Sequence, residues 1–157
     1  MSSGVGETVL FKSVFTDKYV RPINKRTPPN DPKNERLLAD GKGGTHMCLV
    51  KPHTGIDMFH IKSQETNKYW QVKSARDGWI TADADANSDD GTLFDIEYFV
   101  APVTTATAGT TTTVRLRHHY LQRYVCLCKD GDDLCLRALS DSIDKDSKDV
   151  FVCEKFQ

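Results

Sequence analysis

FHIKSQETNKYWQV, residues 59–72, is the most informative segment of the sequence, because the chain repeats its pattern twice more. A similar stretch begins 50 positions earlier at Val9, and another begins 55 positions later at Val114. In each copy the same columns hold an apolar residue, then a basic residue, and a tyrosine seven positions after the basic one. These tyrosines are Tyr19, Tyr69 and Tyr124. Three matches at near-equal spacing in 157 residues indicate threefold internal repetition.

The pattern within each copy predicts strands. Apolar residues alternate with polar ones, a polar turn follows, and a second strand opens with the basic residue and the tyrosine. Further strand-like segments occur at residues 47–50, 78–81, 92–99, 134–136 and 150–153. Three copies of four short strands predict an all-β fold, the β-trefoil, in which three pseudo-symmetric four-stranded repeats close into a barrel. We expect one domain, residues 1–157, with repeats at about 9–58, 59–113 and 114–157.

Three segments between the strands are expected to be loops. The segment 21–36 contains four prolines, which exclude a central strand. The threonine-rich run 104–113 offers no apolar face, so we expect a long mobile connection there. The acidic run 83–91 is closer to a solvated hairpin than to a calcium loop, because Ser88 and Phe94 stand where such a loop requires glycine and glutamate.

Composition narrows the classes of function. A net charge of −1 argues against a nucleic-acid-binding face, and the longest apolar runs are too short for membrane insertion. The first residues lack the features of a signal peptide, so a cytoplasmic or nuclear protein is expected. Five cysteines are an odd number, which favours reduced, buried thiols over a disulfide framework or a zinc site.

No pattern in the sequence indicates catalysis. The five histidines have no metal-ligand spacing, and no nucleophile elbow or phosphate-binding loop is present. We therefore expect no enzymatic activity, no catalytic residue, no cofactor and no metal.

A binding loop is more plausible, and the best candidate ends at Trp79. The indole offers an aromatic face to the C–H surface of a sugar, and Arg76 and Asp77 offer planar hydrogen-bonding groups. Gly78 permits close approach. An alternative is equally consistent with the residue types: Trp79 fills the core, and Arg76 and Asp77 only form a turn.

Several motifs resemble the agglutinin domain of amaranthin-like plant lectins. The motifs are His60-Ile61-Lys62-Ser63, Thr66-Asn67-Lys68-Tyr69, Trp79-Ile80-Thr81-Ala82, Val114-Arg115-Leu116 and Ser147-Lys148-Asp149-Val150-Phe151. The resemblance extends over about residues 9–156. It implies a β-trefoil lectin of the plant nucleus and cytoplasm, with a defence or stress role. It further implies binding to galactose- and N-acetylgalactosamine-containing glycans, typified by Galβ1-3GalNAc.

The same resemblance indicates where a sugar binds. The sugar-contacting loop of that family precedes and includes the tryptophan that matches Trp79, whereas Arg76, Asp77 and Gly78 replace an asparagine and an aromatic residue. In the two-domain family member the sugar lies between domains of two subunits, so a one-domain chain would need a head-to-tail homodimer. The alternative functions are a non-lectin trefoil that binds another protein and a protease inhibitor.

Overall fold

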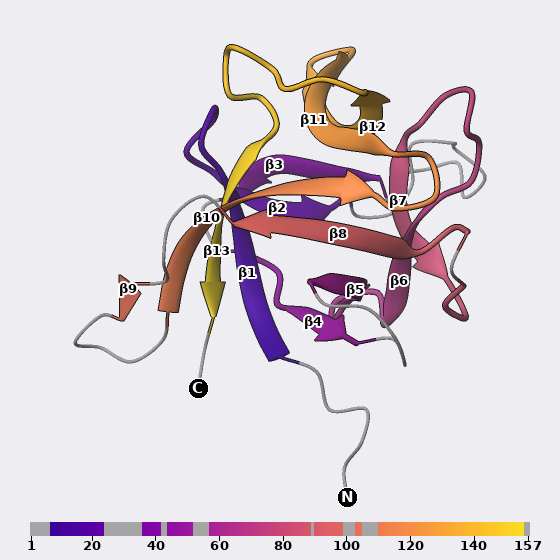
Figure 1. Ribbon diagram of the computed structural model, residues 1–157, viewed down its shortest axis with the longest axis horizontal. Coiled ribbons are helices and arrows are strands. Elements are labelled where there is room, and N and C mark those ends of the chain that lie inside the picture. The colour runs from indigo at the N-terminus through magenta and orange to yellow at the C-terminus, as the bar shows by residue number, and fades with distance from the viewer. Residues whose placement is uncertain are drawn as a thin grey trace, which may run out of the picture.

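Thirteen β-strands form the regular structure of the described chain in the computed structural model (Figure 1). The structure describes residues 7–23, 36–41, 44–51, 57–88, 90–98, 103–104 and 110–155. The strands are β1 (Glu7–Ser13), β2 (Tyr19–Pro22), β3 (Leu37–Gly41), β4 (Met47–Val50), β5 (Met58–Ser63), β6 (Lys68–Val72), β7 (Ile80–Ala84), β8 (Leu93–Tyr98), β9 (Val103–Thr104), β10 (Thr110–His118), β11 (Arg123–Asp130), β12 (Asp133–Ser140) and β13 (Val150–Lys155). Within these ranges no helix is long and apolar enough to cross a membrane.

Six strands close into a barrel. Antiparallel pairings lead from β1 to β4, from β4 to β5, from β5 to β8, from β8 to β10, from β10 to β13, and from β13 back to β1. Each repeat supplies its first and last strand to this ring, and β9 adds a short pairing to the outer part of β10. Closure satisfies the backbone groups that an open sheet would leave at its edges.

The remaining strands form three hairpins that cap the barrel. They are β2–β3, β6–β7 and β11–β12. The hairpins meet pairwise through the bridges Cys135 to Leu38, Arg36 to Thr81 and Trp79 to Arg137. A closed six-stranded barrel with a three-hairpin cap is the β-trefoil, so the predicted fold is confirmed.

The threefold repetition is visible in the register of the strands. Each tyrosine of the repeated motif pairs across its hairpin with the basic residue of the same motif: Tyr19 with Lys12, Tyr69 with Lys62, and Tyr124 with Arg117. A β-bulge directly follows each tyrosine. The residue two positions before each tyrosine has a positive φ: 59° at Asp17, 58° at Asn67 and 57° at Gln122. The three motifs therefore have the same backbone geometry.

Equivalent inward-facing side chains fill the core. Met47, Phe94 and Phe151 occupy the same position in the three repeats, and all three are fully buried. Trp70 joins the repeats at the centre, with its ring centroid 5.6 Å from that of Phe11 and 6.0 Å from that of Phe94. Full burial of one such side chain stabilises the fold by about 1.5–3 kcal/mol. The sequence pattern that recurs three times is thus the pattern of the core.

The expectation of a mobile threonine run at 104–113 was wrong at both ends, because Thr104 belongs to β9 and pairs with Thr110 of β10. Residues 110–113 belong to β10 and pair with β13, and the side chain of Thr112 is 2% exposed. An apolar face is not needed there, because the backbone ladder and the β-branched shape of threonine suffice. Residues 105–109 lie outside the described part of the chain, as do residues 24–35 of the predicted proline loop.

The five cysteines are free, but the expectation that all of them are buried was only partly right. Cys126, Cys135 and Cys153 are buried, whereas Cys48 and Cys128 are half-buried. The Sγ atoms of Cys126 and Cys128 lie 3.7 Å apart, because residues two apart on a strand point to the same face.

Candidate functional site

Trp79, the residue on which the sequence prediction centres, lies in the hairpin cap. Its half-buried side chain packs against a small apolar cluster of Ile23, Leu38 and Cys135. The guanidinium carbons of Arg36 and Arg137 each lie over the indole ring, 4.6 Å from its centroid. Cation–π contacts of this kind contribute about 0.5–2 kcal/mol each. The indole therefore has a structural role in joining the hairpins.

Gly78 closes the same junction through its backbone. Its φ is +77°, a region that side chains with a Cβ seldom adopt, and a Cβ added there would lie 2.4 Å from the carbonyl oxygen of Ala138. The N–H of Ala138 donates a 2.8 Å hydrogen bond to the Gly78 carbonyl. The glycine thus permits close contact between two hairpins, and the contact it permits is with protein.

Arg76 and Asp77 are exposed at the tip of the β6–β7 hairpin. The turn is held by the N–H of Gly78, which donates to the Ser74 carbonyl at 2.8 Å. The Asp77 carbonyl accepts from Nε of Arg137, whereas the Asp77 carboxylate is exposed to solvent. The Asp77 carboxylate is therefore accessible to a ligand.

A small pocket of about 190 Å³ opens beside the indole. We call it the cap pocket; its lining residues are Arg36, Lys73, Ser74, Asp77, Trp79 and Thr81. Next to it, Asp83 accepts hydrogen bonds from the side chains of Thr81 and Gln71 and forms an ion pair with Lys73. Burial alone would raise the pKa of Asp83, but these donors outweigh burial and lower that pKa. The Asp83 carboxylate is thus negatively charged, and it holds Thr81 and Lys73, two of the residues that line the pocket.

The structure brings only part of the predicted site together. Trp79 and Asp77 line the cap pocket, whereas Arg76 and Gly78 do not. Arg36, which was not predicted, approaches from a different hairpin, and it also forms an ion pair with Asp130. No local signal in the sequence marks Arg36 as a neighbour of Trp79.

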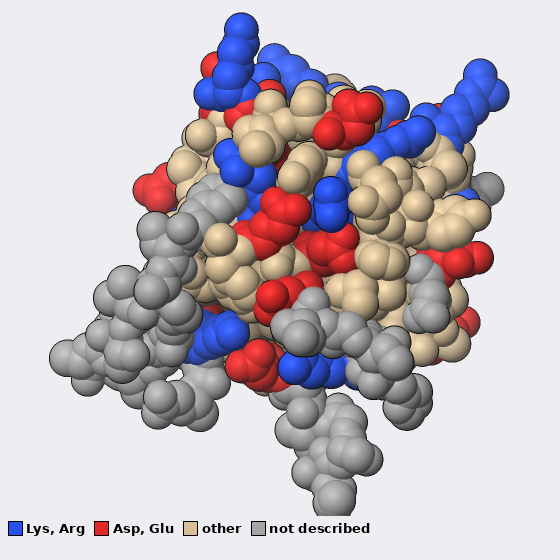
Figure 2. Space-filling model, viewed as in Figure 1, with Lys and Arg blue, Asp and Glu red and all other residues tan. Residues whose placement is uncertain are grey.

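A larger pocket lies on the barrel wall and was not anticipated. Its volume is about 650 Å³, and we call it the barrel-wall groove. The groove is lined by Asp57, Met58, Asp95, Ile96, Glu97, Tyr98, Arg117, His119 and Gln122. No residue lines both pockets. Acidic side chains gather near the middle of the face that carries β8 and β10, with basic side chains beside them (Figure 2).

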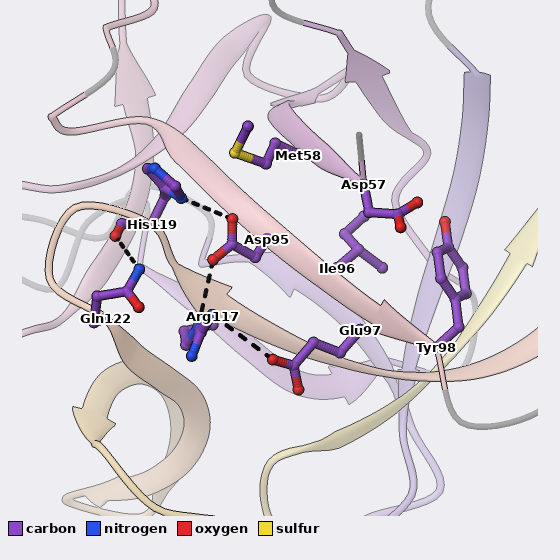
Figure 3. A pocket seen from close by; sticks show the side chains of 9 residues that line it. All are labelled: Asp57, Met58, Asp95, Ile96, Glu97, Tyr98, Arg117, His119 and Gln122. Atoms are coloured by element: carbon purple, nitrogen blue, oxygen red, sulfur yellow. Dashed lines mark hydrogen bonds and ion pairs between the residues drawn. The ribbon is translucent and has the colours of Figure 1, made fainter. Parts of the chain in front are cut away.

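Polar contacts connect the side chains along this groove (Figure 3). Asp95 accepts from Nδ1 of His119 at 2.8 Å and from Nε of Arg117 at 3.3 Å. Arg117 also reaches Glu97, with 3.9 Å between Nη2 and Oε2. Gln122 lies at the His119 end, and Tyr98 lies at the other end near Asp57. Burial raises the pKa of the Tyr98 phenol, which keeps the phenol protonated and able to donate.

Neither pocket has the groups that hold a metal ion. Within the described ranges, no set of three or more His, Cys, Asp or Glu side chains converges in that way. What both pockets offer is hydrogen-bond donors and acceptors around a partly apolar floor, which is the chemistry of reversible binding to a polar ligand.

The Agglutinin domain family matches residues 34–154, more than three quarters of the chain. That range includes every residue that lines either pocket. No curated protein matches the chain by sequence.

Solved structures share the architecture at low sequence identity. One is a Polyporus squamosus lectin bound to the human-type influenza-binding epitope Neu5Aca2-6Galb1-4GlcNAc, with a TM-score of 0.67 and 10% identity. The alignment covers 96% of this chain and 49% of the lectin, so the chain spans about half the length of that protein. At this identity the likeness shows the fold alone.

Two further structures align over nearly their whole length. The BEL beta-trefoil has a TM-score of 0.61 and 9% identity, with 96% of this chain and 93% of that chain covered. The SDF2-like protein from Arabidopsis thaliana has a TM-score of 0.66 and 10% identity, with 98% and 94% covered.

Proposed function

The chain belongs to the Agglutinin domain family, and from that premise we propose that it is a lectin that binds galactose- and N-acetylgalactosamine-containing glycans without catalysis. The observation that carries the proposal is the family match, because it spans the strands and loops that form the cap pocket. The cap pocket supplies a chemistry suited to a neutral sugar.

The cap pocket can recognise a sugar through three kinds of contact. The exposed carboxylate of Asp77 can accept hydrogen bonds from hydroxyl groups, and the guanidinium of Arg36 can donate to ring and hydroxyl oxygens. The part of the Trp79 indole that lines the pocket, beside the two guanidinium groups that lie over the ring, gives the C–H surface of the sugar an apolar neighbour. A ligand that lacks the hydroxyl groups would leave the polar groups unpaired, and this gives the pocket its selectivity.

The cap pocket is small, and its volume suits one sugar ring rather than a chain of them. A disaccharide such as Galβ1-3GalNAc would therefore extend beyond the pocket. We propose that a second copy of the chain covers the projecting part in a head-to-tail homodimer. The exposure of Arg76 and Asp77 at the tip of the β6–β7 hairpin supports this arrangement, because both side chains are available to a second copy.

A glycan array tests the proposal. We expect binding to galactosides and N-acetylgalactosamine glycans, and we expect Asp77→Ala to weaken it roughly 10-fold, the cost of one charge-assisted hydrogen bond. The matched control is Asp141→Ala, which removes an equally charged and exposed side chain elsewhere. Trp79→Phe keeps an aromatic ring in the apolar cluster and should weaken binding while the protein stays folded.

Two results would contradict the proposal. A folded wild-type protein with no response on the array is not a lectin for these glycans. Equal affinity of the wild type, Asp77→Ala and Trp79→Phe would place the sugar outside the cap pocket. Light scattering with and without Galβ1-3GalNAc tests the homodimer separately.

A further inference from the structure

We propose that the barrel-wall groove is a second saccharide-binding site, selective for uncharged sugars and independent of the cap pocket. This inference rests on the proposed lectin function and extends it to a different face of the domain. One repeat meets the next at three places on the barrel wall, and the groove lies at one of them.

The threefold symmetry of the barrel identifies what is special about the groove. The strand registers make Asp95 equivalent to Val152 and Cys48, because each of these residues pairs with the basic residue of a motif: Arg117, Lys12 and Lys62. By the same registers, His119 corresponds to Val14 and Gln64. Only the junction between the second and third repeats therefore combines a carboxylate with a histidine at these positions.

The barrel does not need that combination in order to close. The junction between the third and first repeats forms the same ladder with valine at both positions. Asp95 is also positioned more firmly than a solvated charge, because its side chain is 15% exposed and two donors from β10 and the adjoining turn hold it. Charged groups fixed in a cavity, at positions the fold can fill with valine, indicate a ligand.

The charges in the groove select the class of ligand. Among the residues that line the groove, three carboxylates, Asp57, Asp95 and Glu97, stand against one permanent cation, Arg117, while Lys155 lies behind Tyr98 with Nζ 5.6 Å from its ring centroid. An anionic ligand such as a phosphate or a sialylated sugar would meet this negative excess and be repelled. A purely apolar ligand would bury the carboxylates without partners. An uncharged polyol meets neither obstacle.

A sugar can form hydrogen bonds and apolar contacts with the residues along the whole groove. The oxygens of Asp95 and Glu97 each accept one or two hydrogen bonds within the protein, and a carboxylate can accept about four, so both can receive sugar hydroxyls. The phenol of Tyr98 can donate to a sugar oxygen. Met58 and the ring of Tyr98 give the C–H face of the sugar apolar contacts.

A second site would change how the protein agglutinates its targets. Because the two pockets share no residue, one chain could bind two glycans at once. Cross-linking of glycan-bearing surfaces would then not require a dimer, since one domain would already be bivalent.

Backbone-amide NMR of the full chain, titrated with methyl β-galactoside and with N-acetylgalactosamine, tests the inference. We expect two groups of signals to shift, one around Trp79 and one around Asp95, with separate binding curves. Asp95→Asn should weaken the second curve at least 10-fold and leave the first unchanged. The control is Glu154→Gln, because Glu154 occupies the position of Glu97 at the junction between the third and first repeats.

A second variant covers the case in which Asp95→Asn alters folding. The double variant Asp95→Val with His119→Val copies the residues of the third–first junction, which the barrel is known to accommodate. It should remove the Asp95 signals from the titration and keep the Trp79 signals. Shifts around Trp79 alone in the wild type would overturn the groove and leave the lectin standing. No shift at either pocket would overturn both.

Discussion

The cap pocket and the barrel-wall groove differ in what their residues do for the fold. In the cap pocket, Trp79 is packed into an apolar cluster and covered by two guanidinium groups, and the adjoining Gly78 joins two hairpins. In the groove, Asp95 and His119 occupy positions that hold valine at an equivalent junction. A tryptophan beside a pocket can thus be structural, whereas a charge that departs from internal symmetry has no such explanation.

The difference separates two kinds of position in a protein built from repeats. Positions that match in all three repeats, such as Tyr19, Tyr69 and Tyr124, follow from the barrel and its turns. Positions that differ in one repeat are free of that constraint, so selection for binding can act on them.

Trp79→Ala should give the largest loss, about 3 kcal/mol in the free energy of unfolding. The substitution removes the packing against Ile23, Leu38 and Cys135 together with both cation–π contacts. Asp95→Asn, the matched change in the groove, should cost less than about 1 kcal/mol, because asparagine keeps the shape and one acceptor oxygen of the side chain and Arg117 is 30% exposed. Urea unfolding of the two variants measures the contrast. Equal losses in the free energy of unfolding would mean that Asp95 contributes as much to stability as Trp79 does.

Gly78→Ala should destabilise the protein by about 2 kcal/mol. The new Cβ would combine an unfavourable φ with a clash against the Ala138 carbonyl, which is backbone and cannot rotate away. Gly131→Ala is the control, because Gly131 also has a positive φ, 67°, in the β11–β12 turn. There we expect only the conformational cost, about 1 kcal/mol. Chemical denaturation that ranks Gly131→Ala as the more harmful change would contradict this view of the cap.

The fold could be predicted from the sequence because each repeat is a continuous segment with its own local pattern. Alternation fixes which residues face inward, and the turn before each tyrosine has the same length in all copies, so the hairpins could be aligned without coordinates. The threonine run was misjudged at 110–113 because hydrogen bonds to β13 hold that segment, and side-chain character does not reveal such a partner.

The sites were harder to predict, for two different reasons. Arg36 reaches Trp79 from another hairpin, and nothing in the spacing of the chain indicates this contact. Asp95 and Arg117 are 22 positions apart and meet only when two repeats pair. A signal for the groove does exist in the sequence: alignment of the three repeats shows Asp95 where the others carry valine and cysteine.

The three repeated tyrosines should respond unequally to loss of their hydroxyl groups. The hydroxyl of Tyr19 donates to Glu154 at 2.9 Å, and that of Tyr124 donates to Glu97 at 3.1 Å. Burial, with these carboxylates, raises the pKa of both phenols, so both remain donors. At the equivalent position beside Tyr69 stands Val50, which cannot accept.

Tyr19→Phe and Tyr124→Phe should each lower the free energy of unfolding by about 1 kcal/mol, and Tyr69→Phe should change it by less than about 0.5 kcal/mol. Tyr124→Phe should also weaken saccharide binding in the groove, because it releases Glu97 from a fixed orientation. Thermal unfolding at constant pH ranks the three variants. A loss at Tyr69 as large as at Tyr19 would show that the shared ring packing, rather than the hydroxyl, stabilises the motif.

The smallest expected effect is that of His118 on the pH dependence of stability. Its neighbour His119 lines the groove, whereas His118 is buried in the protein. His118 is 1% exposed and stands where the other repeats carry Ser13 and Ser63. Its Nε2 lies 2.9 Å from the Gly91 carbonyl, and its Nδ1 accepts from the N–H of Leu121, an arrangement that suits the neutral imidazole. Burial is the main cause that lowers the pKa of His118 in the folded protein; the Gly91 carbonyl opposes it only in part.

Because the folded pKa of His118 lies below the unfolded value of about 6.5, the unfolded chain binds more protons as pH falls through that value. Stability is therefore complete above the unfolded pKa and declines below it. The loss between about pH 7.5 and about pH 6 should be at most about 0.8 kcal/mol. His118→Ser, which copies the other two repeats, should remove that part of the pH dependence in urea unfolding at the two pH values. If His118→Ser showed the same pH dependence of the free energy of unfolding as the wild type, another group would be responsible for the titration. His118 would then make the third repeat no more sensitive to acid than the other two.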